Sequence, residues 1–273
     1  MATQTRVSRY KKRRLKRWVY KAGFLFSIIL LVIAANGIFN WWTDNKKIEK
    51  LTSEINNSVS IEEKIPDPDL TENINPPEPE DTSEEANDYW DYMQMNLLSV
   101  DFTELLNKNK DTVGWIKVNG TNINYPIVQT TDNSYYLTHA FDGSYNDAGW
   151  IYADYRNDMV NFDKNTVIYG HSRLDTTMFG SLKNILESDW YNNKDNHIIK
   201  LSTPTENTLW QVFSVYTIEA ESYYITTEFY SDEQYQTFLD TLKNRSNVSF
   251  SATVNTNDKI LTLSTCKDNF GNR

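Results

Sequence analysis

The sequence predicts a mostly β fold: a closed or nearly closed β-barrel with appended helices, preceded by a transmembrane helix and a disordered stalk. Short β-branched and aromatic runs, separated by turn residues, fill the C-terminal part of the chain. An uncharged segment of 18 residues lies near the N-terminus, and an acidic, proline-rich segment follows it. Many strands at short intervals, with few helices between them, indicate a barrel rather than a helical or α/β domain.

The N-terminal segment is basic, whereas the chain as a whole is acidic. Residues 1–21 carry nine Lys and Arg and no Asp or Glu, although the formal net charge of the protein is -10. The basic run 11–17 would suit RNA binding or a nuclear address. The rest of the chain is too acidic to bind phosphate over a broad surface, which argues against nucleic acid as a partner of the main domain.

The segment that follows predicts a membrane anchor. Residues 22–39 contain no charged side chain and are long enough to cross a bilayer core as a helix. Trp18, Tyr20, Trp41 and Trp42 flank them, where aromatic rings favour the membrane interface. We predict a single-pass signal anchor at 22–42 in the cell membrane, with residues 1–21 cytoplasmic and the remainder extracellular. A cleaved signal peptide is the alternative, but its apolar core is usually shorter and no small-x-small site follows.

Residues 43–88 are predicted to form a disordered stalk. Five of the seven prolines fall within 65–80, and residues 53–88 carry twelve Asp or Glu against one Lys. Such a segment buries too little apolar surface to offset the entropy of ordering, and proline keeps it extended. Its early part, "KKIEKLTSEI", has the pattern of a helix that continues from the membrane.

The folded domain is predicted at 89–273. A helical spacing of apolar residues spans 87–109, after which seven strand-like runs follow. These are "TVGWIKVNG", "INYPIVQT", "GWIYADY", "NTVIYG", "HIIKLST", "TLWQVFSVYTIEA" and "KILTLST". Two helical segments interrupt them, "MFGSLKNILES" and "SDEQYQTFLDTLKNR", and Ser231 is the predicted N-cap of the second.

Cys266 is the only cysteine, and it follows the strand-like run 259–265. A single cysteine cannot form an intrachain disulfide, so it is a buried inert residue, an intermolecular bridge or a reactive thiol. His171 likewise follows a strand-like run, after Gly170. A nearby imidazole or guanidinium favours the thiolate, which is the nucleophilic form of cysteine. Cys266, His171 and Arg273 therefore have the chemistry of an activated nucleophile, a proton donor and an oxyanion stabiliser, provided that the fold brings them together.

The motifs together resemble those of a sortase. "TLSTC" ends a strand, an arginine lies seven residues on, "YGH" lies about 95 residues earlier, and an N-terminal anchor precedes the domain. Class B is the most similar class, because "GWIYADYRND" and "YGHSRLDTTMFGSL" resemble its stretches before and at the histidine. The resemblance covers roughly residues 90–273. It differs in one respect: in the family the arginine opens a final strand that closes the barrel, whereas this sequence stops at Arg273.

The resemblance implies a membrane-anchored cysteine transpeptidase of a Gram-positive bacterium, without a cofactor or a metal. Its partners would be surface proteins that carry a C-terminal sorting signal and an amine of the cell-wall precursor or peptidoglycan. Cleavage would give a thioester on Cys266, with His171 as general acid/base and Arg273 as the oxyanion or substrate-orienting residue. The alternatives are a pilin-polymerising sortase, and a non-catalytic membrane-anchored surface module with a buried cysteine.

Other residues are weaker candidates. Ser264 and Thr265 flank the nucleophile and are candidates for substrate binding. Strand alternation places Ser264 on the same face as Cys266 and Thr265 on the opposite face, so Ser264 is the better candidate for lining the groove. Tyr169, Tyr223 and Tyr224 are further candidates for substrate binding, with core packing or simple exposure as the alternatives. The remaining candidates are predicted to be structural, and no spacing of His and Cys suits zinc. They are His139 and His197, and also Asp154 and Arg156, which are predicted to form an ion pair or a turn, with a role on the substrate side as the alternative.

Overall fold

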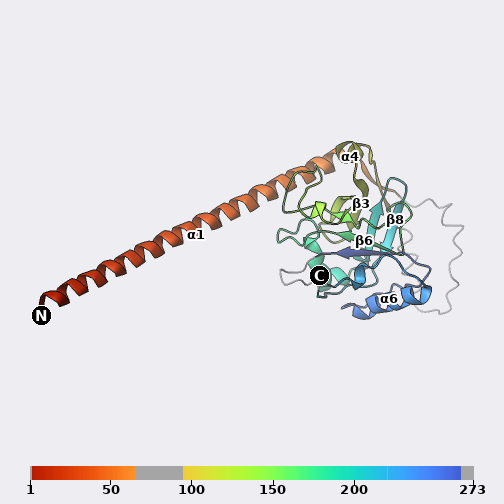
Figure 1. Cartoon of the computed structure of the whole chain (residues 1–273). Coiled ribbons are helices and arrows are strands. Elements are labelled where there is room, and N and C mark those ends of the chain that lie inside the picture. The colour runs from red at the N-terminus through yellow and green to blue at the C-terminus, as the bar shows by residue number, and fades with distance from the viewer. Residues whose placement is uncertain (1, 65–94, 220, 266–273) are drawn as a thin grey trace. The chain divides into compact units, whose positions relative to one another are not determined.

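A computed structural model describes residues 2–64, 95–219 and 221–265 of the 273-residue chain (Figure 1). The chain divides into two compact units, Met1–Glu49 and Lys50–Arg273. Cys266, Arg273 and the proline-rich part of the predicted stalk lie outside the described residues.

The first unit consists of helix. Helix α1 runs over Ala2–Ser58 and contains the whole apolar segment predicted from the sequence. Large apolar side chains on it, such as Phe24, Leu31 and Ile38, are exposed. By length and composition, this helix is suited to cross a membrane. Its course through residues 46–58 also confirms the helical pattern of "KKIEKLTSEI".

The second unit begins with the last turns of α1 and a small two-stranded sheet. Strand β1 (Ile61–Lys64) pairs antiparallel with β2 (Leu97–Val100). Within the predicted stalk, residues 43–64 therefore form helix and strand, which differs from the disorder expected there. The physical reason is tertiary contact: Ile55 is fully buried, and Glu63 binds two lysines of the main sheet.

Seven strands form the main sheet, in the order β8-β7-β3-β4-β5-β6-β9, and curl into a nearly closed barrel. The prediction of a mostly β barrel is therefore confirmed. The strands are β3 (Thr112–Val118), β4 (Asn124–Val128), β5 (Tyr152–Ala153), β6 (Asn165–Tyr169), β7 (Ile198–Ser202), β8 (Asn207–Gln211) and β9 (Ile260–Ser264). Strand β8 ends well before the end of the run "TLWQVFSVYTIEA", so this strand is shorter than predicted.

Two distant segments of the chain meet where β6 pairs with β9 in parallel. The register joins Asn165 to Ile260 at one end and Tyr169 to Ser264 at the other. Every residue of β6 is buried, as its β-branched and aromatic sequence requires of a strand covered on both faces. The two strands therefore reach the same edge of the barrel together.

The helices of the second unit are short, apart from α6. They are α4 (Thr103–Lys108), η1 (Tyr135–Leu137), η2 (Gly180–Leu186), α5 (Ser188–Tyr191), η3 (Lys194–His197), η4 (Tyr223–Ile225) and α6 (Asp232–Arg245). The predicted helix over 87–109 is wrong for 97–100, which form β2, and only Thr103–Lys108 is helical within its described part.

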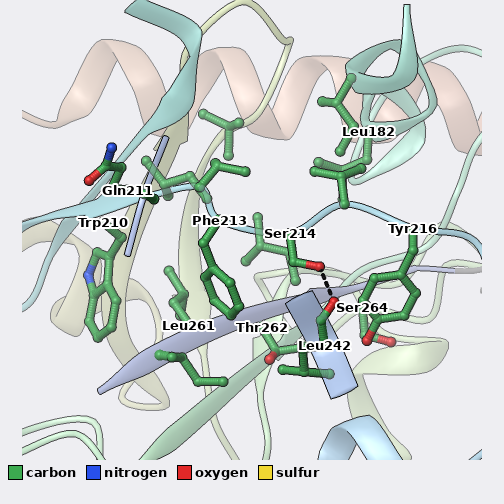
Figure 2. Close-up of a pocket in the computed structure, with 18 of the residues that line it drawn as sticks. Leu182, Trp210, Gln211, Phe213, Ser214, Tyr216, Leu242, Leu261, Thr262 and Ser264 are labelled. Atoms are coloured by element: carbon green, nitrogen blue, oxygen red, sulfur yellow. Dashed lines mark hydrogen bonds between the residues drawn. The ribbon is translucent and has the colours of Figure 1, made fainter. Parts of the chain in front are cut away.

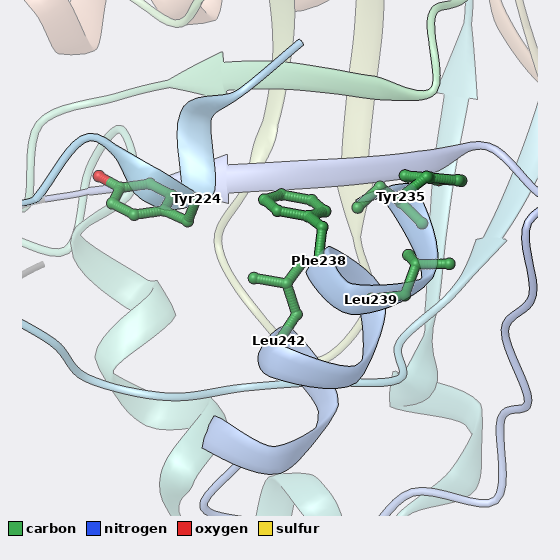
Figure 3. Packing of buried hydrophobic residues seen from close by; sticks show 6 residues of the cluster. Tyr224, Tyr235, Phe238, Leu239 and Leu242 are labelled. Carbon is green, nitrogen blue, oxygen red and sulfur yellow. The ribbon is translucent and has the colours of Figure 1, made fainter. Parts of the chain in front are cut away.

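Helix α6 starts where the sequence predicts. The Ser231 hydroxyl accepts a hydrogen bond from the Gln234 backbone N–H at 3.2 Å, which satisfies one of the free donors of the first turn. Four buried side chains form its inner face and pack with Tyr224 and Ile260 (Figure 3). They are Tyr235, Phe238, Leu239 and Leu242. This cluster fixes the loop that carries Tyr223 and Tyr224 next to strand β9.

Candidate active site

His171 lies two residues beyond the end of β6 and is half-buried. Its Nε2 atom is 2.8 Å from the backbone carbonyl oxygen of Leu137, in the loop that precedes β5. Gly170 allows the turn, because a Cβ atom there would lie 2.5 Å from Ile151 and 2.7 Å from Phe179. The imidazole is thus held between a close-packed turn and the carbonyl of Leu137, which is far away in the sequence but in contact with the ring.

Strand β9 brings its last residues to the same edge. Ser264 is buried, and its hydroxyl is 2.9 Å from the Tyr224 hydroxyl. Thr265 is half-buried, with its Oγ1 atom enclosed and without a hydrogen-bond partner among the described residues. Cys266 follows directly in the sequence but lies outside the described part of the chain.

Tyr169 is tied to a buried carboxylate. Its hydroxyl donates to Asp154 Oδ2 at 2.8 Å, and its ring stacks on Tyr152 at 5.1 Å. Burial, followed by the hydrogen bond to the Asp154 carboxylate, raises the pKa of Tyr169 well above its ordinary value. Tyr169 therefore stays a neutral hydrogen-bond donor, which fits the core-packing alternative.

Asp154 and Arg156 form the ion pair that the sequence suggests. Arg156 donates from Nε and Nη2 to the two Asp154 oxygens at 2.8 and 2.7 Å, and also to the Ile225 carbonyl at 2.9 Å. Burial alone would raise the pKa of Asp154, but hydrogen bonds from Arg156 and Tyr169 hold it below its ordinary value. The pair joins the residues that follow β5 to η4, the short helix that carries Tyr224.

The other candidates lie apart from His171. Tyr223 packs on Phe238, with Arg245 over its ring at 5.4 Å, so it belongs to the α6 cluster. His139 stacks on Tyr135 at 4.0 Å and bonds to that residue's carbonyl. His197 is buried and lies 2.9 Å from the Tyr191 carbonyl. Both histidines thus have local structural partners.

A cavity of about 450 Å³ lies along β9. Figure 2 shows Trp210 and Leu261 near one end and Tyr216 and Ser264 near the other. Its walls come from β9, from the segment 209–218 and from η2, and they are mostly apolar. Ser172 and Thr265, the chain neighbours of His171 and Cys266, also line it. One surface therefore carries the neighbours of both candidate catalytic residues.

Sequence reasoning missed the loop 133–149 as part of the site. Leu137 contacts His171 through its carbonyl, and Asn133 donates from Nδ2 to Asp154 at 3.0 Å. Gly149 lies against both the loop and the imidazole ring. The run between residues 131 and 149 is rich in turn residues and tyrosines, and a backbone carbonyl leaves no residue-type signal in a sequence.

A family described as "Sortase domain" matches residues 116–273, which is more than half of the chain. The chain belongs to the sortase family. "Sortase B" of Staphylococcus aureus (strain NCTC 8325 / PS 47) is 40% identical to this sortase over 167 residues, which cover 61% of this chain and 68% of the relative. The resemblance to class B sortases is therefore confirmed.

Solved structures agree with the family and the fold. A Staphylococcus aureus sortase B–substrate complex has a TM-score of 0.58 and 39% identity, over 62% of this chain and 77% of that one. A sortase B complexed with triglycine has a TM-score of 0.59 and 38% identity, over 63% and 80%. The chain is thus a sortase transpeptidase, with the sortase type of β-barrel.

Proposed function

We propose that this sortase cleaves a C-terminal sorting signal of surface proteins through a thioester on Cys266 and transfers the acyl chain to a cell-wall amine. His171 would be the general acid/base and Arg273 the oxyanion or substrate-orienting residue. The observation that carries the proposal is the parallel register of β6 and β9, together with the position of His171 just beyond β6.

The register supports a contact between the two catalytic candidates. Tyr169 pairs with Ser264, and the Gly170 N–H donates to the Ser264 carbonyl at 3.2 Å. His171 is two residues beyond Tyr169, and Cys266 is two residues beyond Ser264. If the register continued by these two residues, His171 and Cys266 would be neighbours, because paired strands lie about 4.8 Å apart.

The proposed chemistry has two halves. The Cys266 thiolate attacks the scissile carbonyl carbon, and the Arg273 guanidinium stabilises the oxyanion that forms. The carbon–nitrogen bond then breaks, protonated His171 gives its proton to the leaving amine, and a thioester remains. In the second half, an acceptor amine attacks the thioester, neutral His171 takes its proton, and the thiolate leaves.

The partners are inferred from class B relatives. One solved sortase B is described in complex with substrate and another with triglycine, a short chain with a free amine. The same two kinds of partner, a sorting-signal peptide and an amine, suit a thioester intermediate. We further propose that α1 anchors the protein in the cell membrane with residues 1–21 cytoplasmic, because their nine basic residues favour that side.

Intact-protein mass spectrometry tests the proposal. The sortase is incubated with a panel of sorting-signal peptides, without an acceptor amine, and the adduct mass is measured. We expect an acyl adduct on Cys266 with at least one peptide, and its loss when an amine such as triglycine is added. Cys266→Ala should give no adduct, and His171→Ala should slow adduct formation by about 10²-fold to 10⁴-fold.

His139→Ala is the matched control, because the His139 ring lies apart from His171 and bonds to the nearby Tyr135 and Thr138. It should form the adduct at close to the wild-type rate. Equal rates for His171→Ala and His139→Ala would reject the role proposed for His171. An adduct that persists in Cys266→Ala would reject the thioester mechanism.

A further inference from the structure

The carbonyl group of Leu137 is the polar partner of the His171 ring. It lies 34 residues earlier in the chain, and the Nε2-to-oxygen distance is 2.8 Å. Among the described residues, His171 Nδ1 has no hydrogen-bond partner. The two ring nitrogens are thus in different environments, one held by the loop 133–149 and the other available for chemistry.

The structure fixes the direction of this carbonyl from both sides. The preceding carbonyl, of Tyr136, accepts the Trp150 N–H at 2.9 Å, and the following one, of Thr138, accepts the Asn146 N–H at 2.9 Å. The Tyr136 side chain is buried, and its hydroxyl binds Asp111 at 2.9 Å. Neighbouring carbonyls are therefore occupied by the segment 146–150, and the carbonyl of Leu137 turns to the imidazole.

The chemistry of the contact selects one protonation pattern. A carbonyl oxygen accepts hydrogen bonds but cannot donate them, so Nε2 must carry a hydrogen. In the neutral ring, the unprotonated nitrogen is then Nδ1. We propose that the Leu137 carbonyl fixes the Nε2–H tautomer of His171, so that Nδ1 is the atom that takes and returns the proton in transpeptidation. This inference rests on the proposed function of His171.

Gly149 makes the arrangement sterically possible. Its φ angle is +57°, and a Cβ atom there would lie 2.5 Å from the Tyr136 oxygen, 2.8 Å from the Leu137 oxygen and 3.0 Å from His171 Cδ2. A side chain at 149 would thus push both the carbonyl and the ring. Gly149 is a positioning residue, because it acts on the imidazole through the loop.

Nitrogen NMR of the wild-type protein tests the tautomer without any assay of activity. The chain has three histidines, so ¹⁵N-histidine labelling gives three rings, and His171→Gln identifies the signals of His171. When the His171 ring is neutral, we expect its two nitrogens to have clearly different ¹⁵N chemical shifts, that of a protonated nitrogen for Nε2 and that of an unprotonated nitrogen for Nδ1. We also expect the proton on Nε2 to exchange slowly with water. Averaged shifts, or a protonated Nδ1, would overturn the inference.

Gly149→Ala tests the positioning, with Gly143→Ala as the matched control. Gly143 lies in the same loop at φ +77°, but a Cβ atom there would meet only the Tyr135 hydroxyl, at 3.4 Å. Both variants carry the backbone strain of a positive φ, and only Gly149→Ala disturbs the Leu137 carbonyl. We expect Gly149→Ala to lose the separated shifts and to slow thioester formation by about 10²-fold, whereas Gly143→Ala keeps the separated shifts.

Two results distinguish this inference from the proposed function. If His171→Gln forms the thioester as fast as wild type, the proposed role of His171 fails, whatever the NMR spectrum shows. If His171→Gln is inactive but Gly149→Ala keeps both the wild-type shifts and the wild-type rate, then only the positioning by the loop is rejected.

Discussion

Asp154 shows how single residues hold the candidate site. Its side chain is fully buried, yet it accepts hydrogen bonds from Arg156, Tyr169 and Asn133 and from the Arg156 backbone N–H. A buried carboxylate is stable only when its oxygens are paired in this way. Because Tyr169 precedes the Gly170–His171 turn, the network fixes the strand from which the histidine projects.

Asp154→Asn should destabilise the protein by about 2 kcal/mol or more, because its amide N–H₂ would face the Arg156 and Tyr169 donors. Urea unfolding measures the change. Asp240→Asn is the control, since Asp240 is exposed on α6 and accepts from Gln236, which an Asn oxygen also allows. Its effect should stay within about 0.5 kcal/mol. Equal losses for the two variants would contradict the role given to Asp154.

Among the individual residues of the candidate site, some contacts could be predicted from the sequence and others could not. The Asp154–Arg156 pair was predicted, because the residues are two apart and opposite in charge. For Tyr223 and Tyr224 the sequence predicts a place in the wall of the substrate channel, and this stays a prediction: both pack with the α6 cluster, and Tyr224 also lines the cavity along β9. The Leu137 contact was beyond prediction, because it depends on a backbone group and on a tertiary approach across 34 residues.

Strand β1 shows how an element far from the barrel strands in the sequence is attached to them. Glu63 accepts from Lys117 at 2.7 Å and from Lys200 at 3.1 Å, and the Lys200 side chain is only 7% exposed. The hydrogen bond from Lys117, followed by that from Lys200, holds the pKa of Glu63 below its ordinary value. The single carboxylate therefore compensates a largely buried ammonium group.

Glu63→Gln should loosen the β1–β2 sheet, because Lys200 would keep its charge without a carboxylate beside it. We expect a loss of about 1–2 kcal/mol and faster amide hydrogen exchange in β1 and β2. Glu62→Gln on the same strand is the control, since the Glu62 side chain is exposed and its ion pair with Lys64 is long, at 3.7 Å. Exchange rates that change equally in both variants would argue against this anchoring role.

The elements that sequence patterns predicted best are those with long local signals, such as α6 with its Ser231 cap and the strands of the barrel. Strand β2 was mistaken for helix because Leu97, Leu98 and Phe102 fit a helical spacing, and four residues are too few to show alternation. Its pairing with β1 crosses more than 30 residues, which no local pattern can reveal. The parallel pairing of β6 with β9 also joins segments far apart in the sequence, so no local pattern reveals it either.

Across the whole molecule, acidic groups outnumber basic ones, and several carboxylates are held in the charged form. Burial would raise the pKa of Asp175, but hydrogen bonds from Thr177 and Arg173 outweigh it and lower the value, as at Asp154. A carboxylate with a lowered pKa stabilises the fold fully above its unfolded-state value of about 3.9. That stability is lost as the pH falls through the lower folded-state value.

We therefore expect the urea midpoint to stay level from about pH 7 to pH 5 and to fall below about pH 4. Asp154→Asn should show a smaller fall over the same acidic range, because it lacks one of the groups that must be protonated. Urea titrations at a series of pH values measure both curves. Parallel curves for the variant and the wild type would show that Asp154 contributes nothing to the acid sensitivity.

The central claim is that the parallel β6–β9 pair brings residue 171 next to Cys266. Because Cys266 is the only cysteine, His171→Cys creates a single possible intrachain disulfide, which requires Cα atoms about 4.4–6.8 Å apart. Leu174→Cys is the control, three residues further along at a side chain that is 91% exposed. After mild oxidation, free-thiol titration and mass spectrometry should show the disulfide in His171→Cys and free thiols in Leu174→Cys. If both thiols of His171→Cys stay free after oxidation, although their reaction with maleimide shows that both are accessible, the claim is contradicted.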